Sequence, residues 1–187
     1  MNDSKKISKV PVSNTTDFRA IFDQYQHLVY NISYRMTGNR EDAEDATQDV
    51  FLRIHRSINR FRGDAKLSSW VYRIAVNTCL NRERRKKLAS WVSLDFLMQE
   101  EPESQPLSEE TPDRHMEISE TERLIQQAIQ SLPARQKTAI VLHRYENLSY
   151  EDIAGVMEIS LSAVESLLHR AKENLSQKLL SLKKDLF

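Results

Sequence analysis

Apolar residues recur every three or four positions along most of the chain, the period that gathers them on one face of an α-helix. Thr15 or Thr16 is placed to cap a first helix, and Gly38 stands where helix C-termini favour glycine. We therefore expect a helix over residues 17–36. Its broad apolar face comprises Phe18, Ile21, Phe22, Tyr25, Leu28, Val29, Ile32 and Met36.

The same period predicts a second helix from Asn39 to about Ser57. One face is apolar: Ala43, Ala46, Val50, Phe51, Ile54 and Ile58. The opposite face is charged or polar: Asp42, Asp45, Gln48, Asp49, Arg53 and Arg56. A turn over residues 59–63 then leads into a third helix over residues 64–87, which Ser68 or Ser69 could cap.

Four more helices are predicted in the C-terminal part of the chain. The first carries apolar positions from Ile118 to Leu132 and stops near Pro133, and the second covers residues 134–146. The third opens at the capping-box spacing of Ser149 and Asp152 and stops near Glu158, and the last covers residues 161 to about 182. With three Gly, five Pro and few strand-like alternations, the chain is predicted to be all-α.

Charge divides the chain into parts, although its net charge is zero. Residues 16–90 carry fourteen basic and nine acidic residues, whereas residues 91–120 carry nine acidic and one basic, with three prolines. We expect a loose tail over 1–15, a basic helical domain over 16–90, an acidic flexible linker over 91–120 and a second small helical domain over 121–187. An apolar cluster begins the linker: Trp91, Leu94, Phe96 and Leu97.

Several functional classes lack support in the sequence. No apolar run is long enough to span a bilayer, and the N-terminus has no signal-peptide core. Cys79 is the only cysteine, so no intrachain disulfide is expected and a reducing cytoplasm fits. The five His residues are scattered, and neither a metal-ligand spacing nor a phosphate-binding Gly loop is present. We expect no metal, no cofactor and no catalytic residue.

The third predicted helix carries the chemistry of a nucleic-acid interface. Trp70, Ile74, Asn77 and Asn81 fall close to one stripe, and five of residues 82–87 are basic. Cations can neutralise phosphates, and amides can hydrogen-bond base edges. A core helix with a solvated basic end explains the pattern about equally well. On the preceding helix, the acids between residues 41 and 49 suit either a solvated face or docking onto a basic partner helix.

Residues 150–168 have the pattern of a helix-turn-helix. Ala154 falls where the two helices cross, and Ile153, Met157, Ile159, Val164 and Leu167 have the spacing that packs one helix on the other. A structural αα-hairpin is the alternative, and DNA binding is favoured by the completeness of the pattern. Val164, Leu168, Ala171, Leu175 and Leu179 continue the apolar stripe. The outward positions are Ser162, Ala163, Glu165, Ser166, His169, Arg170 and Lys172.

Over almost its whole length the chain resembles the extracytoplasmic-function class of bacterial sigma factors. The core-polymerase-binding part of sigma region 2 is similar to DAEDATQDVFLRIHRSINRF, and its promoter-melting and −10-reading part to SSWVYRIAVNTCLNRERR. Region 4, which reads the −35 element and binds the polymerase flap, resembles LPARQKTAIVLHRYENLSYEDIAGVMEIS with AVESLLHRAKENL. Both blocks, in this order across a short linker, make the resemblance specific.

The resemblance implies roles for three groups of residues. Core polymerase would be bound by Asp42, Asp45, Gln48, Asp49, Phe51 and Leu52. The −10 element would be read by Trp70, Arg73, Asn77, Asn81, Arg82, Arg84 and Arg85. The −35 element would be read by Ser160, Ser162, Ala163, Glu165, Ser166, His169, Arg170 and Lys172.

The implied protein is a cytoplasmic initiation factor and not an enzyme. Its partners would be the β′ clamp and β flap of core RNA polymerase, promoter DNA and an anti-sigma factor tied to the membrane. The sequence departs from the family at Glu158, where Gly is often found, and at Glu165, where members often carry basic residues. Two rival hypotheses are a stand-alone helix-turn-helix regulator, which would bind DNA tightly and as a dimer, and an enzyme acting on nucleic acid.

Overall fold

The computed structural model describes residues 17–61, 63, 66–96 and 120–184. Within these residues the chain forms seven α-helices and one short 3-10 helix, with no strand, so the predicted all-α class is confirmed. The helices are α1 (Phe18–Thr37), α2 (Arg40–Ser57), η1 (Ile58–Arg60), α3 (Leu67–Phe96), α4 (Glu120–Gln130), α5 (Ala134–Arg144), α6 (Tyr150–Met157) and α7 (Leu161–Lys184). The described helices contain no stretch long and apolar enough to cross a membrane.

The first two helices begin and end close to their predicted positions. Asp17 caps α1 by accepting from the backbone N–H of Arg19 at 3.0 Å, so the prediction that Thr15 or Thr16 caps this helix is wrong. Gly38 follows α1 with φ +86°, a left-handed conformation that favours glycine. Asn39 then caps α2 by accepting from the backbone N–H of Asp42 at 2.8 Å.

Helix α3 is longer than predicted. It starts at Leu67, so Ser68 and Ser69 lie in its first turn and do not cap it. It continues to Phe96, nine residues beyond the predicted end at 87 and into the expected linker. Residues 88–96 contain no Gly or Pro that would stop a helix. The side chains of the apolar cluster at 91–97 and the rest of the linker lie outside the described residues.

The helix-turn-helix forms as predicted from α6 and α7. Ser149 caps α6 by accepting from the backbone N–H of Asp152 at 3.1 Å, which confirms the capping-box spacing. Glu158 ends α6 in the left-handed conformation, with φ +54°. The stripe that joins the two helices is buried at Ile153, Val164 and Leu168. Ala171 extends it, while Met157, Ile159, Leu167 and Leu175 are partly buried against the same core.

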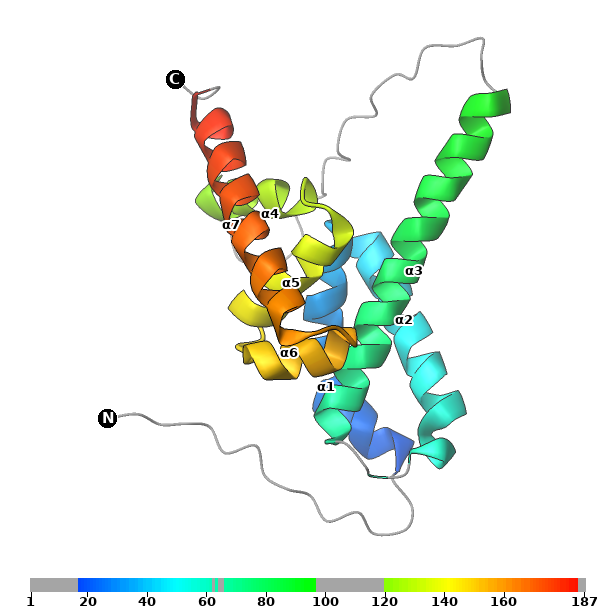
Figure 1. Cartoon of the computed structure of the whole chain (residues 1–187). Helices are drawn as coiled ribbons and strands as arrows, with labels where there is room; N and C mark the ends of the chain where they lie inside the picture. Colours follow the sequence, from blue (N-terminus) through cyan, green and yellow to red (C-terminus); the bar gives the residue numbers. More distant parts are fainter. Residues whose placement is uncertain (1–16, 62, 64–65, 97–119, 185–187) are drawn as a thin grey trace.

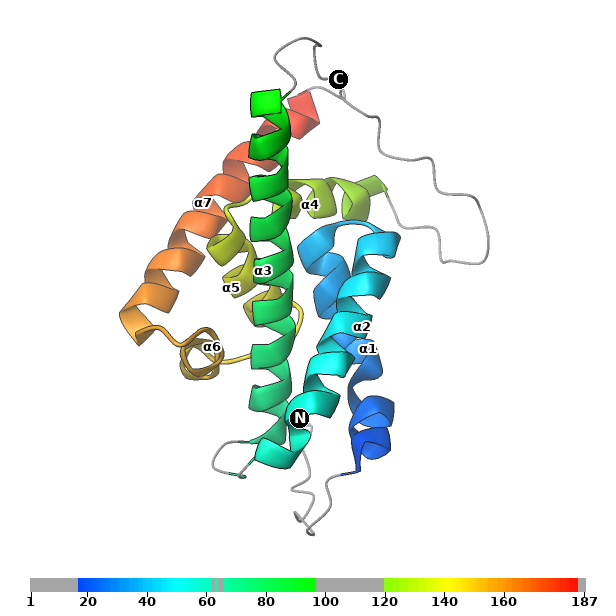
Figure 2. The same cartoon turned by 90° about the vertical axis from the view of Figure 1, so that its right-hand side faces the viewer.

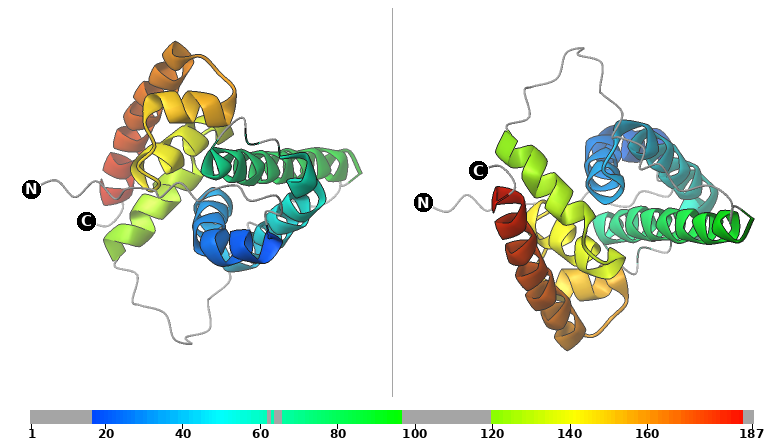
Figure 3. Two further views of the ribbon diagram at one scale, coloured as in Figure 1. Left: turned by 90° about the horizontal axis from the view of Figure 1, so that it is seen from below. Right: turned by 90° about the horizontal axis from the view of Figure 1, so that it is seen from above.

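The two halves of the chain pack against each other, which the sequence did not predict. Figures 1 and 3 show α4–α7 along one side of α1 and α3. Helices α4 and α5 contact α1, and α5 and α6 contact α3. Helix α2 lies on the far side of α3, next to α1 (Figure 2). The buried apolar residues of both halves form one continuous cluster.

Candidate nucleic-acid interface

The acidic face of α2 is paired with the basic end of α3. Arg82 donates from Nη1 to Asp49 at 2.6 Å and from Nη2 to Asp45 at 3.2 Å, and Lys86 pairs with Asp42. Partial burial on its own would raise the pKa of the Asp42 carboxyl, but hydrogen bonds from Lys86 and Asn39 outweigh it and lower this pKa. Residues predicted to bind polymerase and residues predicted to bind DNA therefore hold each other in this structure.

The other predicted polymerase-binding residues of α2 divide between core and surface. Phe51 is 5% exposed and lies in the core, where its ring packs 4.7 Å from that of Phe22. Leu52 is 53% exposed, Phe22 is 38% exposed, and Gln48 is also exposed. A partner can contact Leu52 and Gln48 directly, whereas Phe51 can act only by supporting the surface from inside.

The predicted −10 residues all lie on α3, but they differ in how exposed their side chains are. Trp70 is partly buried, with its ring 5.2 Å from that of Phe61. Asn77 is exposed and Asn81 is half-buried. Arg84 and Arg85 are exposed and make no ion pair within the described part of the chain, so their charges are available to phosphates.

Arg73, another predicted −10 residue, is held by the other half of the chain. Its Nη2 donates to the backbone carbonyl of Gly155 at 2.9 Å, and its Nη1 lies 3.2 Å from a carboxylate oxygen of Glu158. Both acceptors belong to α6 and the turn that follows it. In this arrangement a phosphate or base would have to compete with these two acceptors for Arg73.

The predicted −35 surface lies open on α7. Ser160 caps this helix by accepting from the backbone N–H of Ala163 at 3.2 Å, and Ala163 itself is half-buried. The remaining predicted contacts are exposed: Ser162, Glu165, Ser166, His169, Arg170 and Lys172. A shallow hollow on this surface is lined by Glu165, Ser166, His169 and Arg170.

Glu165 does not pair with His169, the basic residue one turn further along α7. His169 pairs with Glu173 at 3.4 Å and not with Glu165. Glu165 makes no ion pair within the described residues, and its side chain is exposed in the N-terminal part of α7, the part predicted to read bases. It can accept a hydrogen bond from a base edge without first losing a partner.

Sequence reasoning missed the polar residues that join the two halves. Tyr72 of α3 donates to Glu146 at 3.1 Å, and the Arg35 guanidinium of α1 lies 3.8 Å from the ring centroid of Tyr145. Burial raises the pKa of the Glu146 carboxyl, although the hydrogen bond from Tyr72 opposes this shift. Arg35 and Tyr72 lie on helices, whereas Tyr145 and Glu146 lie in the turn after α5, and local spacing cannot distinguish any of these positions from ordinary surface.

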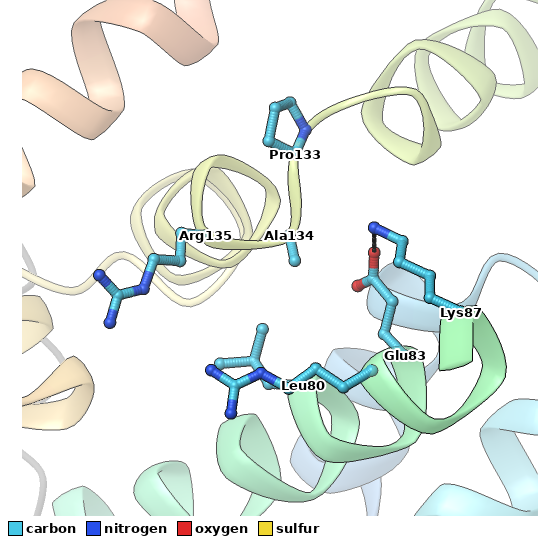
Figure 4. Close-up of a pocket in the computed structure, with 7 residues that line it drawn as sticks. Leu80, Glu83, Lys87, Pro133, Ala134 and Arg135 are labelled. Carbon is cyan, nitrogen blue, oxygen red and sulfur yellow. Dashed lines mark ion pairs between the residues drawn. The ribbon is translucent and has the colours of Figure 1, made fainter. Parts of the chain in front are cut away.

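A buried lysine occupies the junction of α3 and α5. Lys137 is 4% exposed and donates to the backbone carbonyl of Met36 at 3.2 Å and to Gln130 at 3.0 Å, with Glu83 at 3.8 Å. Burial lowers the pKa of this amine. Figure 4 shows the shallow pocket beside it, where Glu83 and Lys87, 3.1 Å apart, face the start of α5 at Pro133. No group of residues in the described chain is arranged to hold a metal ion.

Comparisons with known proteins agree with this arrangement. The family model described as Sigma-70 region 2 matches residues 21–89, and the model described as Sigma-70, region 4 matches residues 122–175. The first match covers most of α1, all of α2 and η1, and most of α3. The second covers most of α4, all of α5 and α6, and much of α7.

Three curated relatives are similar over nearly their full length. The RNA polymerase sigma-H factor of Pseudomonas aeruginosa is 32% identical, covering 95% of this chain and 93% of the relative. The ECF RNA polymerase sigma factor SigW of Bacillus subtilis is 32% identical, covering 95% and 97%. The ECF RNA polymerase sigma-E factor of Escherichia coli K12 is 31% identical, covering 95% and 94%.

Two solved structures share the fold. The sigma factor RpoE of Bartonella quintana, in complex with the anti-sigma factor NepR, has a TM-score of 0.65 at 22% identity, covering 89% of this chain and 98% of that one. CnrH, in complex with the cytosolic domain of CnrY, has a TM-score of 0.60 at 20% identity, with 88% of each chain covered. With both sigma regions matched in order and full-length relatives above 30% identity, this chain belongs to the extracytoplasmic-function class of the sigma-70 family.

Proposed function

We propose that this sigma factor binds core RNA polymerase, reads a two-part promoter and directs initiation there in response to an envelope or stress signal. Residues 16–90 act as region 2, residues 91–120 as the linker and residues 121–187 as region 4. The observation that carries the proposal is the occurrence of both regions in one short chain that is similar over its length to named sigma factors. Initiation is the task of these proteins, so we assign no enzymatic activity to the chain, and we place it in the cytoplasm with the polymerase.

The decisive experiment is reconstitution with core polymerase. Purified protein and core, incubated with a library of random promoter sequences, should yield transcripts that share two elements at a fixed spacing. A stand-alone helix-turn-helix regulator would instead bind DNA without core and yield no such transcripts. Transcripts that appear equally with core alone would contradict the proposal.

The exposed side of α2 is the proposed core-binding surface. Leu52 contributes an exposed apolar side chain beside Gln48 and the acids at 42, 45 and 49. Leu52→Ala should weaken binding to core while the far-ultraviolet circular dichroism stays unchanged, because little of this side chain is buried in the fold. Leu88→Ala is the matched control, since Leu88 is 67% exposed on α3. Equal affinities for core in the two variants would exclude Leu52 from the contact.

Charge reversal tests the acids of the same surface. The Asp45→Lys, Asp49→Lys double variant should lose co-purification with core, because a basic partner helix would be repelled. The double variant also loses both partners of Arg82, so its folding must be checked by circular dichroism. Glu41→Lys, an exposed change on the same helix, supplies the control for charge alone. Undiminished core binding by the double variant would contradict the assignment.

The −10 amides are proposed to hold an extruded base of the melted strand. Asn77 and Asn81 lie one turn apart on α3, with Trp70 two turns before Asn77. Extruding a base costs a few kcal/mol, which a fitted pocket must offset. Asn77→Ala and Asn81→Ala should therefore bind core normally but form fewer open complexes. Permanganate reactivity of the melted strand measures this, and normal reactivity in both variants would show that the amides only solvate the helix.

The remaining proposed partner is an anti-sigma factor. Two proteins of the same fold were solved in complexes, the sigma factor RpoE with the anti-sigma factor NepR and CnrH with the cytosolic domain of CnrY. We extend this to the present chain as sequestration by a protein that is anchored in the membrane. A pull-down from the native host under inducing and non-inducing conditions tests it, and recovery of polymerase alone in both would contradict it.

A further inference from the structure

The contact between α3 and the helix-turn-helix uses Arg73, a residue proposed to read the −10 element. Both terminal nitrogens of the Arg73 guanidinium are engaged, one with the Gly155 carbonyl and one with the Glu158 carboxylate. Its Nε is buried and has no hydrogen-bond partner in the structure. The Arg73 side chain is 38% exposed, but the hydrogen bond and the ion pair direct its guanidinium toward region 4.

Glu158 is an unusual residue for its position. It has φ +54° and ψ +49°, a left-handed conformation in which glycine is less strained than any residue with a side chain. A glycine there would end α6 equally well but could not pair with Arg73. The position also lies three residues before the start of α7, so the Arg73–Glu158 pair lies near the N-terminal end of the proposed recognition helix.

The rest of the interface reinforces this contact. Tyr72, next to Arg73, donates to Glu146, and Lys137 is buried where α5 meets the end of α1. Gly38 lies so close to the end of α4 that a Cβ added to it would be 2.8 Å from the side chain of Gln130. Buried polar partners and this close approach indicate a defined docking of the two halves.

This docked arrangement cannot read a whole promoter. Elements centred near −10 and −35 are about 25 base pairs apart, which is about 85 Å of duplex at about 3.4 Å for each pair. A −10 residue that lies 3.2 Å from the turn of the −35 reader cannot reach across that distance. The two regions must separate before both elements are bound.

We propose that the protein without polymerase rests in this closed form, with the Arg73–Glu158 pair as an autoinhibitory latch that core polymerase must release. The inference builds on the proposed two-element reading. In the closed form Arg73 is withheld from the −10 element while the −35 surface stays exposed. Because only the open fraction can bind core productively, the latch lowers the apparent affinity for core in proportion to the closed fraction.

Distance measurements on the full chain test the closed form itself. Donor and acceptor dyes attached through Asp23→Cys and Gln177→Cys would report the separation of α1 from α7. Burial raises the pKa of the Cys79 thiol to about 11, so the native cysteine should not compete for the dyes. Energy transfer should be high for the protein alone and should fall when core is added. Low transfer in the protein alone would overturn the proposal, while absence of core binding would count against the proposed function instead.

Charge exchange tests the latch. Glu158→Arg places two cations together and should increase the apparent affinity for core by about two- to fivefold, the range of an exposed ion pair. The Arg73→Glu, Glu158→Arg double variant restores the pair with opposite polarity and should return the affinity to the wild-type value. Glu151→Gln, an exposed charge removal on α6, should leave it unchanged. An unchanged affinity in Glu158→Arg, or a double variant that matches the single one, would overturn the latch.

Discussion

The charged side chains of α3 and α7 differ in whether they form ion pairs within the chain. On α3, Arg73 pairs with Glu158, Arg82 with Asp45 and Asp49, and Lys86 with Asp42. On the base-reading part of α7, Glu165, Ser166, Arg170 and Lys172 face solvent without an ion pair in the described residues.

This difference separates two ways of preparing a surface for a nucleic acid. The side chains of α7 are presented by a packed helix and can meet a duplex as they stand. Three cations of α3, namely Arg73, Arg82 and Lys86, would have to exchange carboxylates of the same chain for phosphates, so their use depends on an event that releases them. Arg84 and Arg85 need no such release, because they make no ion pair in the described residues. We therefore infer that region 4 can meet DNA directly, whereas full contact by region 2 requires displacement of its internal ion pairs.

The largest expected effect comes from removing the packing that presents α7. Leu168 is 1% exposed, and Leu168→Ala should lower the free energy of unfolding by about 2–5 kcal/mol, because the cavity left in a dense core is not refilled. Leu180→Ala on the same helix should change it by less than about 0.5 kcal/mol, since Leu180 is 60% exposed. Urea unfolding followed by circular dichroism measures both. Similar midpoints for the two variants would show that this side of α7 does not support the reading surface.

The next prediction tests whether the exposed face of α7 contacts bases directly. Glu165→Gln should relax the preference at one −35 position by about 1–3 kcal/mol, because the carboxylate is placed to accept from cytosine N4. Lys172→Ala should instead weaken binding to all sequences alike and reduce the salt dependence. A randomised −35 library, transcribed with each variant, separates the two. Identical base preferences for wild type and Glu165→Gln would rule out the contact.

A smaller effect tests whether the internal pairs of region 2 have a measurable strength. A double-mutant cycle with Arg82→Ala and Asp49→Ala should give a coupling of about 0.5–1 kcal/mol in the free energy of unfolding, the upper part of the range for partly exposed pairs. The effect is modest because solvent screens both groups. Arg84→Ala, on the same helix but without an ion pair in the described chain, should give no coupling with Asp49→Ala. Zero coupling between Arg82 and Asp49 would mean that replacing Asp49 by a phosphate as the partner of Arg82 costs no stability.

The smallest effect is a pH dependence at Asp42. Its pKa is lowered in the fold from 3.8, so the pair with Lys86 contributes stability above that value and loses it as the pH falls through the lowered pKa. Acid unfolding below about pH 4 should therefore be less steep in Asp42→Asn than in wild type. Glu41→Gln, an exposed change one residue earlier, should follow wild type. Parallel acid-unfolding curves for all three proteins would contradict the assignment.

Local pattern predicted the helices and the outward face of α7 well. The spacing of apolar residues located the buried stripe of α7, and Ser149 with Asp152 marked the start of α6. The outward residues of α7 were identified because they lie off the buried apolar stripe. These features depend on neighbours within a few positions, where the helical period fixes which side chains share a face. The extension of α3 to Phe96 was not predicted, because the acidic, Pro-rich linker was expected to begin at residue 91.

What the sequence determined by itself was the set of helices, their buried faces and the family to which they belong. Only the tertiary structure decided that Arg82 pairs with Asp49, 33 positions away, and that Arg73 reaches Gly155, 82 positions away. Any of several carboxylates has the charge to pair with these cations, and spacing along a helix says nothing about which one lies opposite on another helix. That choice follows from how the two halves bury their apolar faces against each other, because the resulting core fixes which polar side chains meet at its edge.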